Sequence, residues 1–373
     1  MMTESVVATT TPATLLAATL ASAKPLTLAE YRGVMTPLEL DAQEREIAAL
    51  AHEAAVHDLG WMRRVAVHGE DRFRWLSGMV TNTVKDLGTN AGAWNLVLNA
   101  QGRIQGDLTV WREGEELELE IAANQYDRLM AHFEHFIIMD DVELHPMGAE
   151  PGAGETAVGV TGPEAEAVLA RIGLPAISEA MTSTRVEWNG LDLKVFRGHG
   201  VLAPHFTIWT PAAGLMRLWR TLSTGGATPV GCRALEAFRI AEGIPAYGVD
   251  IVERDLPQET AQMRALHFSK GCYLGQEIVE RIRSRGNVHR HLRSLELSGP
   301  VPETGTELTL EGVAVGHITS AAELALAEGA RKFALAMLRA EAETDRAPLN
   351  YQAGSETGEA RPLTGPPAWN EQR

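Results

Sequence analysis

The segment Ser269–Glu280, with the sequence SKGCYLGQEIVE, holds one of only two cysteines in a chain of 373 residues. Cys272 lies between a Lys-Gly pair and a tyrosine, just before a run, GQEIVERIR, that is predicted to be helical. Free N–H groups at a helix N-terminus stabilise a thiolate, and Lys270 adds a positive neighbour. A small buried side chain that fills a tight junction is the other interpretation of this cysteine.

The composition indicates a globular protein of two or three domains, with 45% hydrophobic residues to form a core. A formal net charge of -16 argues against general nucleic-acid binding, because phosphate backbones are held by clustered Lys and Arg. Two cysteines, Cys232 and Cys272, are too few for a disulfide scaffold and favour a reducing compartment. No apolar run reaches the roughly 18 to 20 residues that span a bilayer. We therefore expect a cytoplasmic protein with no membrane-bound part.

Both ends of the chain are predicted to lie outside the core. Residues 1–30 contain a short apolar run and an Ala-Ser-Ala that is similar to a signal-peptidase site, but the start carries Glu4 and no Lys or Arg. A disordered or loosely helical extension is expected there. Residues 351–373 are rich in Gly, Pro and polar side chains, and a disordered tail is expected.

Helical and strand patterns alternate between these ends. Residues 42–59 have helical spacing and are followed by an alternating strand, RRVAVHGE. Asn124 is the expected N-cap of a helix, NQYDRLMAHFEHFI. The stretch AVGVTGPEAEAVLARIG repeats the order of strand, turn and helix. From His291 onward, short β segments separated by turns predict a small barrel. The expected fold class is α+β followed by an all-β module.

Several common enzyme motifs are absent from the sequence, namely GxGxxG, GxxxxGK[ST], HExxH and GxSxG. The pairs His132 with His135 and His289 with His291 lack the companion Cys or carboxylate spacing of a zinc site. No metal site is predicted.

A run of arginines from Arg281 to Arg293 follows the cysteine segment in a chain that is otherwise acidic. Such a run can be a solvated helix face that balances Glu277 and Glu280. It can also form a local basic rim that holds a small polycarboxylate ligand.

The residues Lys270–Glu277, KGCYLGQE, resemble the K-G-C-Y-x-G-Q-E signature of the YgfZ family. These are folate-binding iron–sulfur maintenance proteins related to the glycine-cleavage T-protein. Further segments resemble the family in the same order along the chain: VAVHGEDRFRWLSGMVTNTV, LNAQGRIQGDLTVWR, RIAEGIPAYGVDI, RGNVHRHLRSL and GVAVGHITS. The resemblance leaves out only the two tails.

The resemblance implies a T-protein-like ring of three domains around a central channel. Residues 31–150 and 151–287 would be the two parts of the folate-binding region, both mixed α/β, and residues 288–350 the C-terminal β-barrel. The implied cofactor is tetrahydrofolate or a one-carbon-substituted folate, with its pterin inside the channel.

Asp107 stands where the T-protein has an Asp that faces the folate nitrogens. A carboxylate can accept from ring N–H groups and pass a proton; a turn residue is the other interpretation. Asn99, Arg103, Arg239 and Tyr247 are carried over as channel residues, since Tyr can stack on a pterin and Arg can bind carboxylates in a bidentate manner. All four can also be structural contacts.

The resemblance makes Cys272 and Asp107 the candidate catalytic residues. The rest of the cysteine motif is expected to belong to the folate site, namely Lys270, Gly271, Tyr273, Gly275, Gln276 and Glu277. One departure is that the family reads R-I-E-A-G where this chain has Ala241 and Glu242. A one-residue shift on a helix rotates the carboxylate by about 100°, so an altered folate contact is expected.

Two functional classes follow from the resemblance. The first is a folate-binding accessory protein for iron–sulfur cluster assembly or repair, with Cys272 as its redox- or cluster-sensitive group. Its partners would be iron–sulfur client or assembly proteins, bound transiently. Two cysteines cannot supply the four thiolates that a cluster usually takes. The second is an aminomethyltransferase of the T-protein type. The cysteine motif favours the first, because the T-protein generally has K-x-x-F-I-G-[RK]-E there. A scaffold that keeps only the fold is a third alternative.

Overall fold

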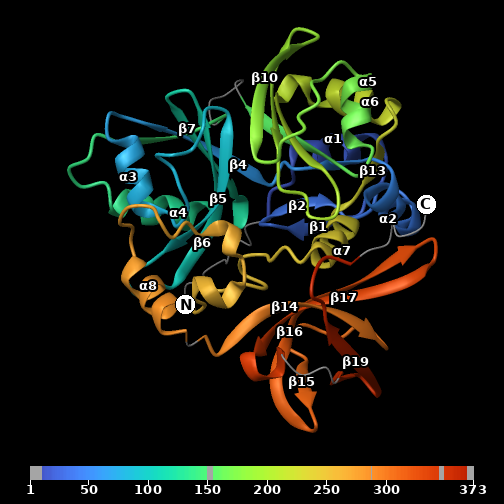
Figure 1. Cartoon of the computed structure of the whole chain (residues 1–373). Coiled ribbons are helices and arrows are strands. Elements are labelled where there is room, and N and C mark those ends of the chain that lie inside the picture. The colour runs from blue at the N-terminus through green and yellow to red at the C-terminus, as the bar shows by residue number, and fades with distance from the viewer. Residues whose placement is uncertain (1–10, 149–153, 287, 344–347, 368–373) are drawn as a thin grey trace, which may run out of the picture.

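The computed structural model describes residues 11–148, 154–286, 288–343 and 348–367. Figure 1 shows three lobes that meet at the centre of the molecule. The first lobe carries α3 (Arg72–Met79) and α4 (Ala123–His135), and the second carries α5 (Ala165–Arg171) and α6 (Leu215–Thr224). The third lobe is the C-terminal barrel.

A single 11-stranded sheet runs through the first two lobes. The halves meet where Thr182 pairs with Ala91. The strand order is β13 (Thr228–Val230), β3 (Ala55–Asp58), β9 (Glu155–Thr161), β12 (His205–Pro211), β11 (Leu191–Arg197), β10 (Thr182–Trp188), β5 (Ala91–Leu98), β6 (Ile104–Glu113), β7 (Glu116–Ala122), β4 (Met62–His68) and β8 (Glu143–Pro146).

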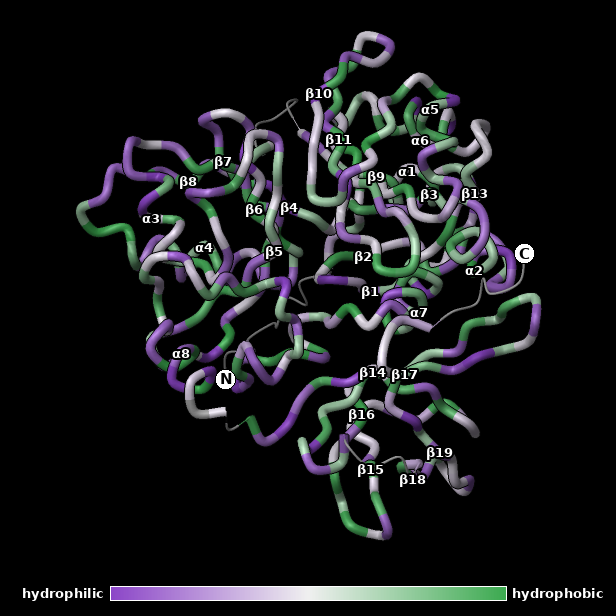
Figure 2. Tube along the Cα trace, in the orientation of Figure 1, coloured by the Kyte–Doolittle hydropathy of each residue, from purple (hydrophilic) through white to green (hydrophobic). Residues whose placement is uncertain are grey.

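Strict alternation on β6 and β7 positions the site. Leu108, Val110 and Leu119 point into the core of the first lobe, against α3 and α4. Successive side chains on a strand point to opposite faces, so Asp107 and Glu120 lie on the other face. Figure 2 shows hydrophobic segments along these strands and a largely hydrophilic α8 (Gln276–Arg285).

The barrel is closed and extends past residue 350, where the expected barrel domain ended. Its order is β14 (Arg290–Ser298), β17 (Gly329–Arg339), β16 (Val313–Leu326), β15 (Glu307–Leu310), β18 (Leu349–Ala353) and β19 (Glu356–Pro362). The expected disordered tail 351–373 is therefore wrong as far as residue 367, and residues 368–373 lie outside the described part. Gly358 fits against the ring of Tyr351, which fills the place of a side chain, so a Gly-rich stretch still completes the barrel.

A disordered or loosely helical extension was expected over residues 1–30; residues 1–10 lie outside the described part, and from residue 11 onward the segment is folded and partly helical rather than disordered. The segment forms α1 (Leu15–Ala23) and β1 (Leu28–Tyr31), and β1 pairs with β2 (Val34–Pro37). Thr14 caps α1 by accepting from the N–H of Ala17 over 3.0 Å. Leu16 is fully buried in the core of the second lobe, which fixes the helix there.

The long helix expected over residues 42–59 ends early. Helix α2 (Gln43–His52) is followed by β3, whose four residues are all buried in the second half of the sheet. Strand β3 thus belongs to the second lobe, although 31–150 was expected to form one part. Asn124 is not the N-cap of α4, because Ala122 occupies that position.

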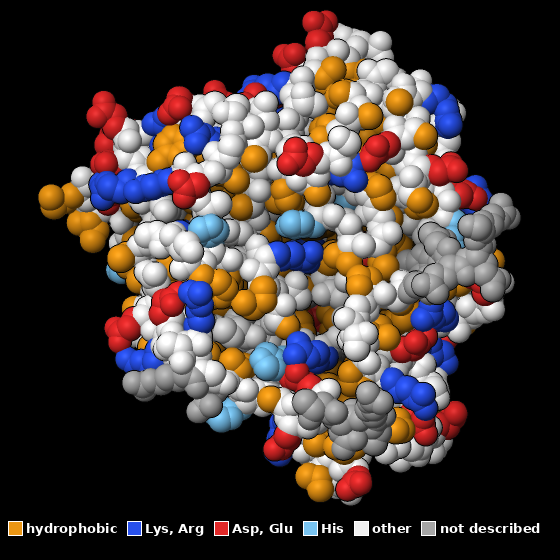
Figure 3. All heavy atoms as spheres, viewed as in Figure 1, with side chains coloured by type: hydrophobic (Ala, Val, Ile, Leu, Met, Phe, Trp, Pro, Cys, Tyr) orange, Lys and Arg blue, Asp and Glu red, His pale blue; other side chains and the backbone are white. Residues whose placement is uncertain are grey.

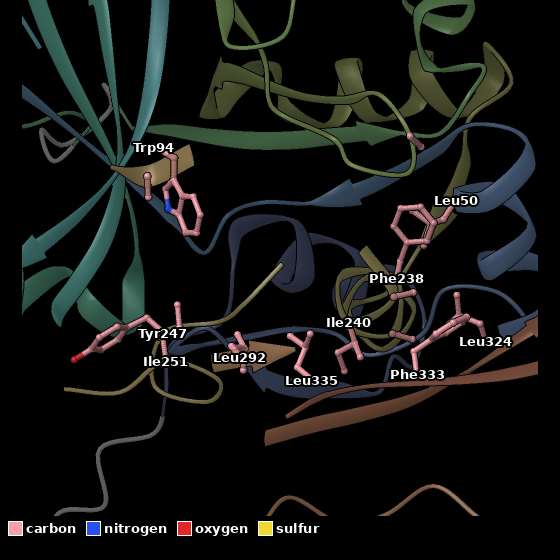
Figure 4. Close-up of a cluster of buried hydrophobic side chains, with 14 of the residues drawn as sticks. Leu50, Trp94, Phe238, Ile240, Tyr247, Ile251, Leu292, Leu324, Phe333 and Leu335 are labelled. Atoms are coloured by element: carbon pink, nitrogen blue, oxygen red, sulfur yellow. The ribbon is translucent and has the colours of Figure 1, made fainter. Parts of the chain in front are cut away.

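A central core joins the three lobes (Figure 4). Phe238 and Ile240 of α7 (Cys232–Glu242) pack against Phe333 and Leu335 of β17 in the barrel. The remaining helices are short 3-10 turns: η1 (Ala212–Gly214), η2 (Pro257–Thr260), η3 (Met263–Ala265) and η4 (Ala340–Glu343). The prediction of an α+β fold with a C-terminal small β-barrel is confirmed. Within the described ranges, no helix has both the length and the apolar content needed to cross a bilayer.

Candidate functional site

A cavity of about 330 Å³ lies between the first two lobes, and α7 with the loop after it forms one wall. Seven aromatic side chains are among its lining residues: Tyr31, Trp61, Trp94, Trp111, Phe196, Phe238 and Tyr247. Figure 3 shows a hollow where the lobes meet, bordered by Lys, Arg and His side chains. Ligand pockets span about 300–1,000 Å³ and are mostly apolar with a few polar groups, so this cavity suits a flat ring system.

Asp107 lies in the cavity wall, and two neutral donors fix its carboxylate. Trp94 Nε1 donates to Oδ2 over 2.8 Å, and Gln125 Nε2 donates to Oδ1 over 2.9 Å. The Asp107 N–H donates back to Gln125 Oε1 over 3.0 Å. Each carboxylate oxygen keeps a second lone pair for a ligand N–H.

Glu120 is a second cavity carboxylate, which the sequence reasoning missed. Trp111 Nε1 and Trp209 Nε1 each donate to it over 2.6 Å. Burial raises the pKa of Glu120, while hydrogen bonds from Trp209 and Trp111 act in the opposite direction. The alternation of LELEIAA, with Glu118 and Glu120 on one face of a strand, is the signal that could have revealed it.

Arg239 and Tyr247 both line the cavity. The guanidinium of Arg239 is occupied, because it binds Glu236, the Ile244 carbonyl and Asp250. Burial opposes the charge, but these carboxylates raise the pKa of Arg239. The guanidinium of Arg128 lies 4.5 Å from the ring centre of Tyr247, so one face of that ring is covered by a cation.

Asn99 and Arg103 do not line the cavity. Asn99 Oδ1 accepts from the backbone N–H groups of Gln101 and Arg103, both over 3.0 Å, and so it holds a turn. The side chain of Arg103 binds the carbonyl of Arg254. In this structure both residues have structural contacts.

The cysteine motif packs on that turn and not in the cavity. Gly275, with φ of +81°, brings its backbone against Asn99, where a Cβ would lie 2.6 Å from the carbonyl oxygen. Tyr273 is buried, Gln276 accepts from the Tyr273 N–H over 3.3 Å, and Glu277 is exposed. The expectation that the motif shares the folate cavity therefore does not match the lining residues.

Cys272 is exposed, and Gly271 beside it is exposed as well, so the interpretation of a buried structural cysteine is wrong. Helix α8 begins only at Gln276. Lys270 reaches inward and donates to the carbonyls of Val80 and Asn82, both over 2.6 Å. Burial, with a smaller effect of Lys85, lowers the pKa of Lys270 to about 7. The lysine thus anchors the loop that presents the thiol.

Glu242 lines the cavity at the end of α7, one residue after the position of the family carboxylate. Its Oε1 accepts from the N–H of Leu202 over 2.9 Å, which ties α7 to the loop at Leu202. Burial raises the pKa of Glu242 to about 7, and backbone N–H groups around Leu202 partly offset this. The one-residue shift in the sequence predicted an altered folate contact, but it did not predict that the Glu242 side chain lines the cavity.

Two buried histidines also line the cavity. Thr161 Oγ1 lies 2.9 Å from His57 Nε2 and 2.7 Å from His205 Nδ1, so one hydroxyl joins both rings. Burial holds the pKa of His57 well below its usual range and lowers the pKa of His205 to about 4. Both rings are therefore neutral near pH 7.

The arginine run is largely neutralised by nearby carboxylates. Arg281 pairs with Glu277 at 2.6 Å and Arg283 with Glu280 at 3.5 Å. Arg290 pairs with Asp255 and Glu259, and Arg293 with Glu343. These four arginines therefore fit the interpretation of a charge-balanced surface better than that of a basic rim that holds a ligand.

Three carboxylates on β6 and β7 approach each other within 4.8 Å, namely those of Glu113, Glu116 and Glu118. Lys194 pairs with Glu113 at 2.5 Å and with Glu118 at 2.8 Å. These carboxylates are already paired with a protein cation, so the cluster does not indicate a metal or other ligand.

The chain belongs to the family of the GCVT N-terminal domain, which matches residues 26–270. Residues 290–371 match the CAF17 C-terminal beta-barrel domain. The GCVT match includes the strands of the cavity and the loop up to Lys270, and the second match includes the barrel.

The aminomethyltransferase of Rubrobacter xylanophilus is 26% identical over 79% of this chain and 78% of its own length. A putative chloroplastic transferase of Arabidopsis thaliana is 23% identical over 75% of this chain, and the match spans 64% of that relative. The crystal structure of the glycine cleavage system aminomethyltransferase T from Bartonella henselae has the same fold. Its TM-score is 0.85 at 18% identity, and the superposition covers 96% of this chain and 98% of that one.

Proposed function

We propose that the protein binds tetrahydrofolate, or a one-carbon-substituted folate, and supports the assembly or repair of iron–sulfur clusters. The observation that carries the folate part is the Asp107 carboxylate, held by Trp94 and Gln125 in an aromatic cavity. Its free lone pairs suit a ligand that donates hydrogen bonds, and the aromatic lining residues suit a flat one. A reduced pteridine is both.

The residues present fit such a group. Asp107 accepts from ring N–H groups, and Trp94 and Tyr247 supply aromatic surface beside it. Bound tetrahydrofolate supplies nitrogens that can carry a one-carbon unit. The chain itself binds and orients the ring and excludes water from it. The Lys270–Glu277 motif lies apart from these lining residues.

The accessory role is supported by the exposed thiol. Cys272 stands on a loop that Lys270 anchors from within, and a surface thiol can exchange or share a ligand with a client protein. Cys232 is 4% exposed, and burial raises its pKa to about 11. The two thiols therefore have opposite environments, and Cys272 is the one available to a partner.

The alternative is an aminomethyltransferase of the T-protein type. The aminomethyltransferase relatives favour it, as does the same Asp107 carboxylate. The two proposals share folate binding and differ in whether a one-carbon unit is moved.

The first experiment titrates wild type, Asp107→Ala and Asp107→Asn with tetrahydrofolate, and tryptophan fluorescence monitors the binding. Loss of a hydrogen bond to a charged group costs about 1.5–3 kcal/mol, so Asp107→Ala is expected to bind about 10- to 150-fold more weakly. Asp107→Asn keeps the shape and should fall between the two. Wild-type affinity in Asp107→Ala would contradict the assignment of this cavity.

A second experiment separates the two functions. Purified protein is tested for aminomethyl transfer from a lipoylated carrier to tetrahydrofolate, and measurable transfer would establish the alternative. In cells that lack the protein, the activity of iron–sulfur enzymes is compared after expression of wild type, Cys272→Ala or Cys232→Ala. The accessory role predicts that only Cys272→Ala fails to restore it.

A further inference from the structure

Glu120 is a buried carboxylate of the cavity whose hydrogen-bond partners are neutral side chains. Its neighbour on the same face, Glu118, is ion-paired with Arg64 at 2.7 Å and with Lys194 at 2.8 Å. Glu120 is instead held by two neutral indoles, Trp111 of β6 and Trp209 of β12. These strands belong to different lobes, so the carboxylate is clamped from both sides of the cavity.

The clamp leaves acceptor capacity unused. An ionised carboxylate has about four lone-pair sites, and the indoles use one on each oxygen. Only 6% of Glu120 is exposed, and what it exposes lines the cavity. Each oxygen of this buried carboxylate is already hydrogen-bonded, and its second lone pair can accept from a donor on a ligand in the cavity.

The spacing of the two cavity carboxylates points to a single ligand. Glu120 pairs in register with Thr109, and Asp107 lies two residues before Thr109 on the same face of β6. Diagonal neighbours of this kind have Cα atoms roughly 7–8 Å apart. A fused two-ring heterocycle can bridge such a distance. Its amino-substituted edge offers two parallel N–H groups, which match the two oxygens of one carboxylate.

We propose that Glu120 selects the ligand by accepting hydrogen bonds from the amino-pyrimidinone edge of the pteridine, while Asp107 faces the other end of the ring system. This rests on the tetrahydrofolate binding proposed above. Trp209 does not line the cavity, so it acts on the ligand only through Glu120 and is a positioning residue.

The test compares tetrahydrofolate with its 2-deamino-2-methyl analogue, which lacks the exocyclic amine, on wild type, Glu120→Gln and Trp209→Phe. Sites built around a hydrogen bond reject ligands that lack it. We expect wild type to prefer tetrahydrofolate at least ~30-fold, Glu120→Gln to reduce the preference below about threefold, and Trp209→Phe to reduce it partially. The loss should come from weaker binding of tetrahydrofolate, with the affinity for the analogue nearly unchanged.

Trp188→Phe is the matched control, since Trp188 is a buried indole of the second lobe that donates to the Ile172 carbonyl and does not line the cavity. Its ligand preference should equal that of wild type. Near-ultraviolet circular dichroism checks that each variant is folded. If Glu120→Gln does not fold, Trp209→Phe carries the test.

The possible failures can be told apart. Wild type that binds tetrahydrofolate, together with folded variants that keep the full preference, would overturn the role of Glu120 and leave the proposed function standing. Wild type that binds neither ligand would overturn both. Equal affinity of wild type for the two ligands would show that the amino edge is not read in this cavity.

Discussion

The guanidinium of Arg239 donates to the carboxylate of Asp250 over 2.7 Å, and both side chains are buried. The other oxygen of Asp250 accepts from the hydroxyls of Thr319 and Ser320 on β16, each over 2.6 Å. One carboxylate thus ties α7 to the barrel. The two sides of this contact come from RIAEGIPAYGVDI and GVAVGHITS, two of the segments that resemble the family. Arg239 therefore helps to position the barrel domain and also lines the cavity.

Replacement of Asp250 by Ala is expected to destabilise the protein by about 3–5 kcal/mol, because removal of one partner leaves a buried charge unpaired. The barrel should become the first part to unfold. Urea denaturation, followed together with proteolysis of the barrel, measures both effects. Glu277→Ala removes an exposed pair with Arg281 and should change stability far less. Equal effects of the two variants would contradict the docking role of Asp250.

Glu242 predicts a specific pH dependence of stability. Its pKa is about 7 in the folded protein against an ordinary 4.5, chiefly because of burial. Between these two values the folded state holds a proton that the unfolded state has lost, so stability falls as pH rises through this window. The full shift corresponds to roughly 3 kcal/mol.

Glu242→Gln should remove this component, so its free energy of unfolding should fall less than that of wild type between pH 4.5 and pH 7. Thermal or urea unfolding at several pH values measures the difference. Glu187→Gln alters an exposed carboxylate and serves as the control. Parallel curves for wild type and Glu242→Gln would show that folding does not raise the pKa of Glu242.

The two thiols should react very differently. We expect one thiol per native chain to react rapidly with iodoacetamide, at Cys272, because it is exposed. Cys232 should react only after unfolding, because it is 4% exposed and burial raises its pKa to about 11. Peptide mass spectrometry after timed labelling locates the modified residue. Rapid labelling of Cys232 in the native protein would be incompatible with this packing.

Two glycines allow a matched test of the contact between the cysteine motif and the turn at Asn99. Gly275 and Gly286 have similar φ values, +81° and +70°, so Ala at either should cost about 1–2 kcal/mol in backbone strain. A Cβ at Gly275 also meets the Asn99 carbonyl at 2.6 Å, whereas one at Gly286 meets nothing within 4 Å.

We therefore expect Gly275→Ala to cost a further ~1–3 kcal/mol, since the backbone of the turn must shift. Differential unfolding of the two variants measures this. Equal losses in Gly275→Ala and Gly286→Ala would mean that the turn yields without cost.

The sequence by itself determined the fold class and the place of Asp107, because these depend on local periodicity and short motifs. Alternation over DLTVWR placed Asp107 on a strand, and the short β segments after His291 indicated a barrel.

Only the tertiary structure decided which residues meet. Trp209 lies 89 positions from Glu120 in the sequence, and no local pattern reports such a contact. Distant contacts also decided the place of β3, which pairs with β9 in the second lobe. They likewise decided the place of β19, which lies in a Gly-rich stretch and closes the barrel by pairing with β14. Burial and backbone pairing between distant strands overrode composition at both ends of the chain, and they took Asn99, Arg103 and the cysteine motif away from the cavity.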